Sequence, residues 1–448
     1  MKSYQTKSLC PECKQLIDAE VFTKDNKVFM KKKCKKHGNF MCLLSSDAEY
    51  YENSLRFNKP GQRALHYETK VRKGCPDDCG LCPAHKQHTC LALIDITEQC
   101  NLNCPNCFAS AGKGKHLTLK QIETMLDQLI KCEGKLDVLQ ISGGEPTIHP
   151  DLIKIIKLAR KRPIRMVMIN TNGLRIAQDK AFVKELAKFK AGFEIYLQFD
   201  GFKKETYKKL RGKDLRDIKL RAIENLAEAQ IPITLVATIK KGVNEDEIGS
   251  IVRFALKTEW IRGITFQPIT FVGRYDKDFD PKDRTTATCV IKAIEEQTQG
   301  LFKKSDFVPL PCPYPLCCSL TYAYVKNGKP MPITRNLDID KYYDYVSNQI
   351  AFDPKRIIQK ALARFPKLET FKALQDFSCC VPVKRLMLSR KERRDYANNT
   401  LRIVVKPFMD AYTFDIKRIE KCCIHFILPD KRLIPFCAHN ILYRPKCQ

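Results

Sequence analysis

The chain lacks any apolar run long enough to cross a bilayer. No stretch of its 448 residues approaches the roughly 20 uninterrupted apolar residues that a spanning helix needs. Its first residues, MKSYQTKSLCPEC, also lack the apolar core of a secretory signal. We therefore expect a cytoplasmic protein, with at most a peripheral contact at the inner membrane surface.

Acidic side chains are scarce relative to basic ones. The chain has 79 Lys and Arg against 50 Asp and Glu, a net charge of +29. Such a field attracts nucleic acids, anionic membranes or phosphorylated substrates. Only KKKCKKHG and RKERR are dense basic runs, so an ordinary solvated surface explains the charge equally well. No recognisable RNA-binding module accompanies it, and we do not expect a nucleic-acid partner.

The chain also lacks low-complexity linkers, and its only internal repeat is a doubled cysteine motif. Residues 1–65 open with CPEC and reach KKKCKKHG, which predicts a metal-binding, ribbon-like domain with a short hairpin near residues 28–30. Residues 66–90 form a cysteine-rich segment that we expect to hold an auxiliary cluster. Residues 91–275 have a regular pattern, and residues 276–448 form a C-terminal domain with further cysteines.

Residues 91–275 alternate apolar, β-rich runs with segments of helical period. Two helical segments, LTLKQIETMLDQLIK and DLIKIIKLARK, begin with capping signals at Thr118 and Asp151. Near-continuous apolar strands joined by helices indicate a parallel sheet in an α/β fold, which right-handed crossovers wind into a partial (β/α)6 barrel like part of a TIM barrel. The predicted strands cover residues 90–97, 136–142, 164–171, 193–200, 233–239 and 264–270.

The 22 cysteines are the most informative residues, because a reducing compartment uses clustered thiols for metals or catalysis rather than for disulfides. Two triads share the spacing Cys-x3-Cys-x2-Cys: Cys75, Cys79 and Cys82, and Cys100, Cys104 and Cys107. Three thiolates can hold three irons of a [4Fe–4S] cluster, which normally takes four cysteines. The missing ligand leaves an open metal position, where substrate chemistry occurs. A structural zinc site is the alternative.

The downstream triad has the context of a catalytic site. Cys100 directly follows a predicted strand, at the rim where parallel α/β sheets bind ligands. Phe108 follows the third cysteine, and the next strand runs into SGGEP, which begins at Ser142. Paired glycines let the backbone approach a ligand closely, and Glu145 offers a carboxylate to an amine. The upstream triad follows no strand and has His85 and Cys90 nearby, so we predict that protein ligands complete it.

These motifs resemble the radical S-adenosylmethionine (SAM) superfamily, whose catalytic domain is a partial (β/α)6 barrel. The resemblance rests on Cys100, Cys104, Cys107 and Phe108, followed by Gly143-Gly144-Glu145-Pro146. It implies that the open iron chelates the amino and carboxylate groups of SAM. Reductive cleavage would then give methionine and a 5′-deoxyadenosyl radical that abstracts hydrogen. It also implies a reductant such as ferredoxin or flavodoxin.

The resemblance implies SAM contacts at the strand ends. The end from Ser142 to Glu145 would hold the methionine amine, and the next two ends would reach the sulfonium or ribose. Thr238 and Pro268, at the following ends, are weaker candidates. Asn172 and Asp200 also fit plain turn positions beside glycine. The candidate SAM-binding residues are Phe108, Ser142, Gly143, Gly144, Glu145, Asn172, Gln198 and Asp200.

Motifs outside the barrel resemble a narrower group. CPEC…KCKKHG, GCPDDCGLCPAHKQHTCLALIDIT and PDKRLIPFCAHN are similar to the archaeal tetraether lipid synthases, formerly grouped with methyltransferases proposed to act on a dihydropterin. The similarity covers essentially the whole chain. It implies several iron–sulfur clusters, one mononuclear rubredoxin-like iron, and the joining of terminal carbons of two isoprenoid lipid chains.

The other cysteines suggest further metal sites. Cys10, Cys13 and Cys34 need one more ligand, for which His37, Cys42 or a distant cysteine could serve, and zinc and iron both fit. The upstream triad would bind an auxiliary [4Fe–4S] cluster, and the C-terminal cysteines supply another. We expect one ligand from each adjacent pair at 317–318, 379–380 and 422–423. The predicted C-terminal ligands are Cys312, Cys317, Cys380, Cys423 and Cys437.

Two enzyme functions follow. The first is coupling of isoprenoid tails in a diether phospholipid. It requires two hydrogen abstractions, a place to hold the first carbon radical, and an apolar tunnel with basic residues at its mouth for phosphate headgroups. The alternative is a radical SAM methyltransferase acting on a pterin or another small ring, or an RNA-modifying radical SAM enzyme.

Overall fold

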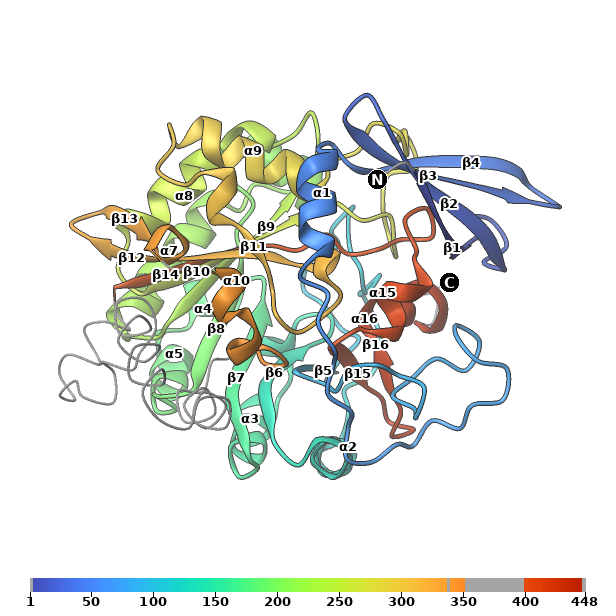
Figure 1. The fold of residues 1–448 in the computed structure, drawn as a ribbon. Coiled ribbons are helices and arrows are strands. Elements are labelled where there is room, and N and C mark those ends of the chain that lie inside the picture. The colour runs from blue at the N-terminus through green and yellow to red at the C-terminus, as the bar shows by residue number, and fades with distance from the viewer. Residues whose placement is uncertain (1–2, 337–338, 351–398, 445–448) are drawn as a thin grey trace, which may run out of the picture.

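The computed structural model describes residues 3–336, 339–350 and 399–444. Figure 1 shows the chain as a blue N-terminal sheet beside a long central sheet, with the red C-terminal helices next to the blue sheet. The predicted ligand Cys380, its neighbour Cys379 and the run RKERR lie outside the described residues.

The N-terminal sheet is a four-stranded antiparallel meander in the order β1-β2-β3-β4. The predicted hairpin near residues 28–30 is part of this sheet, where residues 19–24 pair with residues 27–32. Val21, Val28 and Met30 point to one side and pack with Ala48 and Tyr51 of the following helix, because side chains alternate between the faces of a strand. These elements are β1 (Ser3–Leu9), β2 (Leu16–Lys24), β3 (Lys27–Cys34), β4 (Gly38–Ser45) and α1 (Ala48–Leu55).

All six predicted barrel strands are present and pair in parallel, in the order β5-β6-β7-β8-β9-β10. The predicted partial (β/α)6 barrel is therefore confirmed. Its strands are almost entirely buried, as a sheet with covered faces requires. They are β5 (Leu91–Asp95), β6 (Leu136–Ser142), β7 (Ile164–Thr171), β8 (Phe193–Gln198), β9 (Ile233–Ile239) and β10 (Ile261–Pro268).

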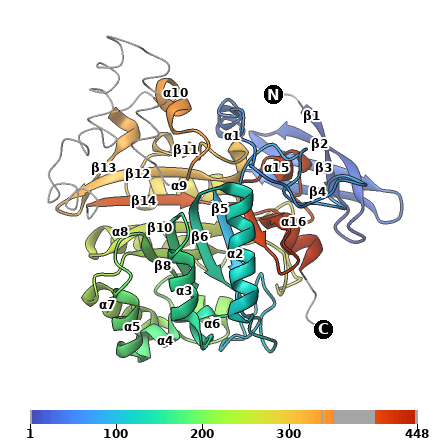
Figure 2. The same cartoon turned by 90° about the horizontal axis from the view of Figure 1, so that it is seen from below.

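Helices cover the outer side of these strands (Figure 2). The capping signal at Thr118 is confirmed, because its side chain accepts from the Gln121 amide while Gln121 accepts from the Thr118 amide. Asp151 precedes its helix but makes no side-chain cap bond, and its own amide donates to His149 Nδ1. The helices are α2 (Leu119–Glu133), α3 (Leu152–Arg160), α4 (Leu174–Gln178), α5 (Lys180–Ala187), α6 (Lys204–Arg211), α7 (Arg216–Glu228) and α8 (Ile248–Lys257).

The C-terminal region extends both edges of the same sheet. β14 (Thr400–Val405) pairs in parallel with β10, and β15 (Ile424–Ile427) pairs in parallel with β5. The described part of residues 276–448, a range predicted as a domain of its own, thus also flanks the two sides of the barrel rim. Further elements here are α9 (Ala287–Gln297), β11 (Val308–Pro309), β12 (Ser319–Lys326), β13 (Lys329–Pro332), α10 (Ile339–Tyr342), α15 (Ile416–Glu420), β16 (Leu433–Pro435) and α16 (Phe436–Ala438).

None of the helices in the described ranges is both long enough and apolar enough to span a lipid bilayer.

Candidate functional site

A cavity of about 240 Å³ opens at the carboxyl ends of the barrel strands. Cys100, Cys104 and Cys107 all line it, and they come from the loop that follows β5. The structure also brings most of the predicted SAM-binding residues to this cavity. They are Phe108, Ser142, Gly143, Gly144, Glu145, Asn172 and Gln198, together with the weaker candidates Thr238 and Pro268.

The two glycines of SGGEP allow the loops after β5 and β6 to touch. A side-chain carbon on Gly143 would come within 2.3 Å of the Thr97 carbonyl oxygen, and one on Gly144 within 2.1 Å of the Gln99 carbonyl oxygen. Only glycine fits such a close approach. The contact is fixed by the Gly144 amide, which donates to the Thr97 carbonyl at 2.8 Å. The glycines therefore position the triad loop as well as edging the cavity.

Glu145 ties two strand ends together. Its Oε1 accepts from the hydroxyls of Thr147 at 2.6 Å and Thr171 at 2.7 Å, and its Oε2 accepts from the Asn172 amide at 2.7 Å. Burial raises the pKa of Glu145, and these donors oppose the rise. The carboxylate is thus already bonded by protein groups. Its predicted contact with the methionine amine stays a prediction and would use the remaining lone pairs.

Asp200 does not reach the cavity, which corrects the expectation that it contacts SAM. Its side chain is fully buried, and both oxygens accept from the Arg211 guanidinium at 2.7 Å. Arg211, near the end of α6, lines the cavity in its place. With its amide oxygen turned toward this guanidinium, Gln198 accepts two further bonds of 2.8 Å.

Arg211 was missed because nothing in the run TYKKLRG shows that its arginine turns inward. The Asp200 carboxylate balances the buried positive charge, as such pairs require. Burial lowers the pKa of Arg211, but the Asp200 carboxylate raises it more, and the nearby Cys104 and Cys107 add to the rise. A fixed cation beside the triad can bind a carboxylate in the cavity.

Asn172 is held in place from three sides. Its Nδ2 donates to Asn101 Oδ1 at 2.7 Å, and its Oδ1 accepts from the Leu174 amide at 3.0 Å. Its backbone carbonyl accepts from Lys219 Nζ at 2.6 Å. Lys219 is fully buried, and burial lowers its pKa to about 8. Asn172 therefore acts as the expected turn residue and also edges the cavity.

The cavity has two unlike walls. One carries amide and hydroxyl groups: Asn170 Nδ2 donates to Ser142 Oγ at 3.3 Å, and Gln267 Nε2 donates to Tyr196 Oη at 3.2 Å. Asn170 Oδ1 is buried and has no hydrogen-bond partner. The other wall is aromatic. Its rings are Phe108, Phe408, Phe426 and Phe436, with centroids of Phe408 and Phe436 4.2 Å apart.

The three C-terminal rings were missed because their positions depend on how β14 and β15 pair with the two edges of the barrel. Phe408 follows β14, and Phe426 lies within β15. No local pattern in the sequence indicates these pairings.

The N-terminal ribbon holds a compact four-ligand site. The ligand atoms of Cys10, Cys13, Cys34 and His37 all lie within 4.8 Å of one another. His37 Nδ1 is 3.5 Å from Cys10 Sγ and 3.4 Å from Cys34 Sγ, and the sulfurs of Cys13 and Cys34 are 3.9 Å apart. Metal bonds of about 2.0–2.3 Å in a tetrahedron put ligand atoms at such separations. The set therefore fits one zinc or iron ion.

His37 is thus the fourth ligand among the predicted alternatives. Cys42 is excluded from the set because its thiol donates to the Tyr412 carbonyl at 3.1 Å. These four protein ligands fill every position of a tetrahedral metal site. A site without an open position suits a structural metal.

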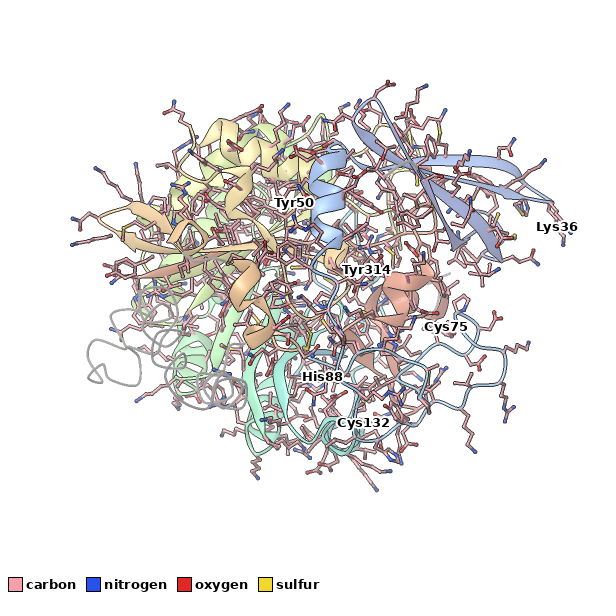
Figure 3. The ribbon with its side chains drawn as sticks, viewed as in Figure 1. Lys36, Tyr50, Cys75, His88, Cys132 and Tyr314 are labelled. Atoms are coloured by element: carbon pink, nitrogen blue, oxygen red, sulfur yellow. A yellow bond between two sulfur atoms is a disulfide. The ribbon has the colours of Figure 1, made fainter. Side chains whose placement is uncertain are left out.

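The upstream triad lies in a segment without helix or strand, against the C-terminal residues (Figure 3, Cys75). Its predicted protein ligands are engaged elsewhere. His85 Nε2 contacts the Cys422 carbonyl at 2.8 Å, and Cys90 forms a disulfide with Cys312. Neither therefore completes the triad in this structure. The thiol of Cys422 is close enough to help raise the pKa of Cys79, after the effects of Cys75 and of burial.

The C-terminal cysteines fall into two groups. Cys423 Sγ lies within 4.8 Å of both Cys90 and Cys312. Cys422 instead faces Cys317 and Cys437: burial, then these two thiols, raise its pKa to about 12. Both members of the adjacent pair thus lie near other sulfurs, and the expectation of one ligand from this pair stays a prediction. Cys312 is bonded to Cys90 in this structure, so its predicted role as a cluster ligand requires that disulfide to be reduced. The free thiols become ligands only after losing a proton, which a bound metal promotes.

The two cysteines at 317–318 have different surroundings, and the expectation of one ligand from this pair stays a prediction. Cys317 accepts from Arg418 Nε at 3.3 Å within the sulfur group, whereas Cys318 packs among Leu310 and Leu320. Cys132 accepts from Gln128 Nε2 on α2, and Figure 3 shows it near the bottom of the molecule.

Family models match two parts of the chain. The Radical SAM superfamily matches residues 94–255, and the HMPTM N-terminal zinc ribbon domain matches residues 3–46. Together with the cavity and its triad, these matches define a radical SAM enzyme, with a [4Fe–4S] cluster that binds SAM and with auxiliary metal sites.

One relative matches over nearly the full length. The chain is 37% identical to the 7,8-dihydro-6-hydroxymethylpterin dimethyltransferase of Methanocaldococcus jannaschii, over 99% of this chain and 94% of that protein. The chain belongs to the family of this protein within the radical SAM superfamily.

Other similarities are confined to part of the chain. A probable GTP 3′,8-cyclase of Pyrococcus abyssi is 29% identical over 38% of this chain and about half, 53%, of its own length. The solved structure of Streptococcus suis SuiB bound to precursor peptide SuiA matches 44% of each chain at 21% identity, with a TM-score of 0.38. The narrower group of tetraether lipid synthases stays a prediction.

Proposed function

We propose that this enzyme uses the SAM-derived radical to remove a hydrogen atom from a reduced pterin or a similarly flat, nitrogen-rich ring. A methyl group from a second SAM molecule replaces that hydrogen, the reductant supplies two electrons in all, and S-adenosylhomocysteine is left. The observation that supports this proposal is that one wall of the cavity is aromatic and the other carries amide and hydroxyl groups. Phe408 and Phe436 stack on each other, and Phe426 stacks with Phe436, so they form an apolar aromatic wall against which a flat ring can pack edge to face. Amides on the opposite side, including the unpartnered Asn170 Oδ1, match the donors and acceptors along the edge of such a ring.

The full-length relative supports the same choice. Its name assigns it methylation of a dihydropterin, and the sequence similarity extends over 99% of this chain. This observation favours the alternative substrate class of the sequence analysis over lipid tails.

Different residues of the cavity would hold the cluster, SAM and the substrate. The thiolates of Cys100, Cys104 and Cys107 would hold the [4Fe–4S] cluster, which supplies the electron for SAM cleavage. Arg211 would bind the SAM carboxylate, and the strand end at Ser142 to Glu145 would border the amine. Gln140, Asn170 and Gln267 would orient the substrate so that one carbon faces the cosubstrate.

Coupling of lipid chains is the second candidate, and one observation favours it. Cys437 follows Phe436 directly, and its Sγ accepts from the Met409 amide at 3.4 Å, one residue after Phe408. A group of sulfurs therefore lies directly behind the aromatic wall. An auxiliary cluster there could hold the first of two carbon radicals. The amide wall disfavours this candidate, which calls for a long apolar tunnel.

The deciding experiment supplies both substrates to the reconstituted anaerobic enzyme. The reaction contains a chemical reductant, SAM and either 7,8-dihydro-6-hydroxymethylpterin or a diether phospholipid, and mass spectrometry reads the products. We expect a pterin with an added one-carbon group, and deuterium on the reacting carbon should appear in 5′-deoxyadenosine.

The variant Gln267→Leu should reduce the pterin product by about tenfold while SAM still cleaves without substrate, since one hydrogen bond to a substrate is worth roughly 1.5 kcal/mol. Gln178→Leu, which changes an exposed glutamine at the end of α4 that does not line the cavity, is the matched control. A tetraether product with no pterin product would overturn the proposal in favour of the second candidate.

A further inference from the structure

The triad loop borders solvent on both sides of Cys104. Cys104 is 9% exposed and lies between Asn103 and Pro105, which are both exposed. The other side of the loop faces the cavity, where SAM and substrate would bind. An electron that arrives from another molecule can reach the triad across this exposed stretch.

Helix α6 stands directly beside the exposed stretch. Asn106 Nδ2 donates to the Lys209 carbonyl at 3.5 Å. Gly212, which ends α6 with a φ of +84°, faces the Asn103 carbonyl and the Pro105 ring, each 3.6 Å from where a side-chain carbon would sit. Underneath, Tyr207 packs in the same apolar group as Cys104. The loop and the end of α6 thus form one continuous surface.

This surface carries uncompensated positive charge. Lys204, Lys209 and Lys213 are exposed, and none of them forms an ion pair within the described part of the chain. The neighbouring carboxylates are taken by other partners: Glu205 pairs with Lys208 at 3.4 Å, and Asp214 pairs with Arg216 at 2.8 Å. Asp217, on α7, is the remaining exposed acid of the stretch. The three lysines therefore present a net positive field beside the triad.

We propose that Lys204, Lys209 and Lys213, with Asn103 and Pro105, form a reductant surface that docks a small acidic protein carrying a one-electron redox group. Opposite charge steers such a partner to this face and raises its association rate. Transfer complexes of this kind are small and short-lived, with less than roughly 1,200 Å² buried, so a few lysines around a polar centre suffice. The proposal rests on the radical SAM class and not on the substrate.

The test uses the reconstituted enzyme and a purified flavodoxin as the acidic carrier. The double variant Lys209→Glu/Lys213→Glu reverses two charges of the reductant surface. The matched control, Lys157→Glu/Lys257→Glu, changes exposed lysines near the ends of α3 and α8. These helices run back along the sheet, so their ends lie at the edge opposite the triad.

Two readouts separate docking from chemistry. Titration calorimetry at low salt should show oxidised flavodoxin binding about tenfold more weakly to the surface variant, and unchanged to the control. 5′-Deoxyadenosine formation without substrate should fall with reduced flavodoxin as donor and stay unchanged with dithionite. Equal flavodoxin binding by both variants would overturn the proposal. An equal loss with dithionite, or binding of a transfer RNA but not of flavodoxin at this surface, would overturn it too.

Discussion

The two cysteine triads have the same spacing but different surroundings. Cys100, Cys104 and Cys107 follow a strand of the parallel sheet, and their sulfurs line the cavity. Cys75, Cys79 and Cys82 lie in a segment without regular structure, where the Cys79 amide donates to the Tyr443 hydroxyl at 3.0 Å. The first triad is open to ligands on the side of the barrel, and the second is covered by the C-terminal residues.

This difference shows what converts a metal-binding spacing into a reactive site. Spacing supplies the ligands, but the rim of the sheet supplies a side free of protein. The downstream triad also has neighbours that the upstream one lacks. A glycine pair lets two loops meet, and the buried Arg211–Asp200 pair places a cation next to the sulfurs.

The largest expected difference between the triads comes from removing one cysteine ligand from each. Cys104→Ala should abolish 5′-deoxyadenosine formation and lose the iron of one cluster, because the cluster loses one of its three cysteine ligands. Cys79→Ala should lose a similar amount of iron yet keep SAM cleavage within about tenfold, as for changes outside the reacting centre. Iron analysis and chromatography of the nucleoside check both. Wild-type cleavage by Cys104→Ala would contradict the assignment.

Loss of the ribbon ligand should have a local effect. His37→Ala leaves three cysteines for one ion, and structural metals contribute directly to folding. We expect loss of the single metal and faster proteolysis within residues 3–46, with SAM cleavage retained. His66→Ala, which removes a partly exposed surface histidine paired with Glu68, is the control. A ribbon that stays protease-resistant without metal would show that packing alone holds it.

The smallest expected effect concerns Lys219, below the downstream triad. Burial lowers its pKa to about 8, so the folded protein loses this proton at lower pH than the unfolded chain, where lysine titrates near 10.4. Between these values the unfolded state binds more protons, so the Lys219 contribution to the free energy of unfolding rises with pH, by at most about 1.4 kcal/mol per unit.

The variant Lys219→Met should lack this rise. Denaturant unfolding of both proteins at several pH values between about 7 and 10 gives the difference. A difference that does not change with pH would mean that the Lys219 amine titrates normally.

The sequence predicted the barrel strands and the reactive triad well, because both follow from short-range patterns. Strand ends of a parallel sheet gather at one rim, so Asn172 and Gln198 could be placed at the cavity before their contacts were known. Asp200 shows the limit of this reasoning. A strand-end carboxylate can face the cavity or turn away, and Arg211, eleven residues later, decides the direction.

The sequence by itself determined the apolar strands, the ligand spacings and the glycines of the rim, since each depends on residues a few positions apart. Only the tertiary structure decided which distant cysteines meet and which rings close the cavity. β14 and β15 are close in sequence yet pair with opposite edges of the barrel, which brings Phe408 and Phe436 together at its mouth. Such pairings depend on the fit of whole surfaces, and local periodicity carries no record of them.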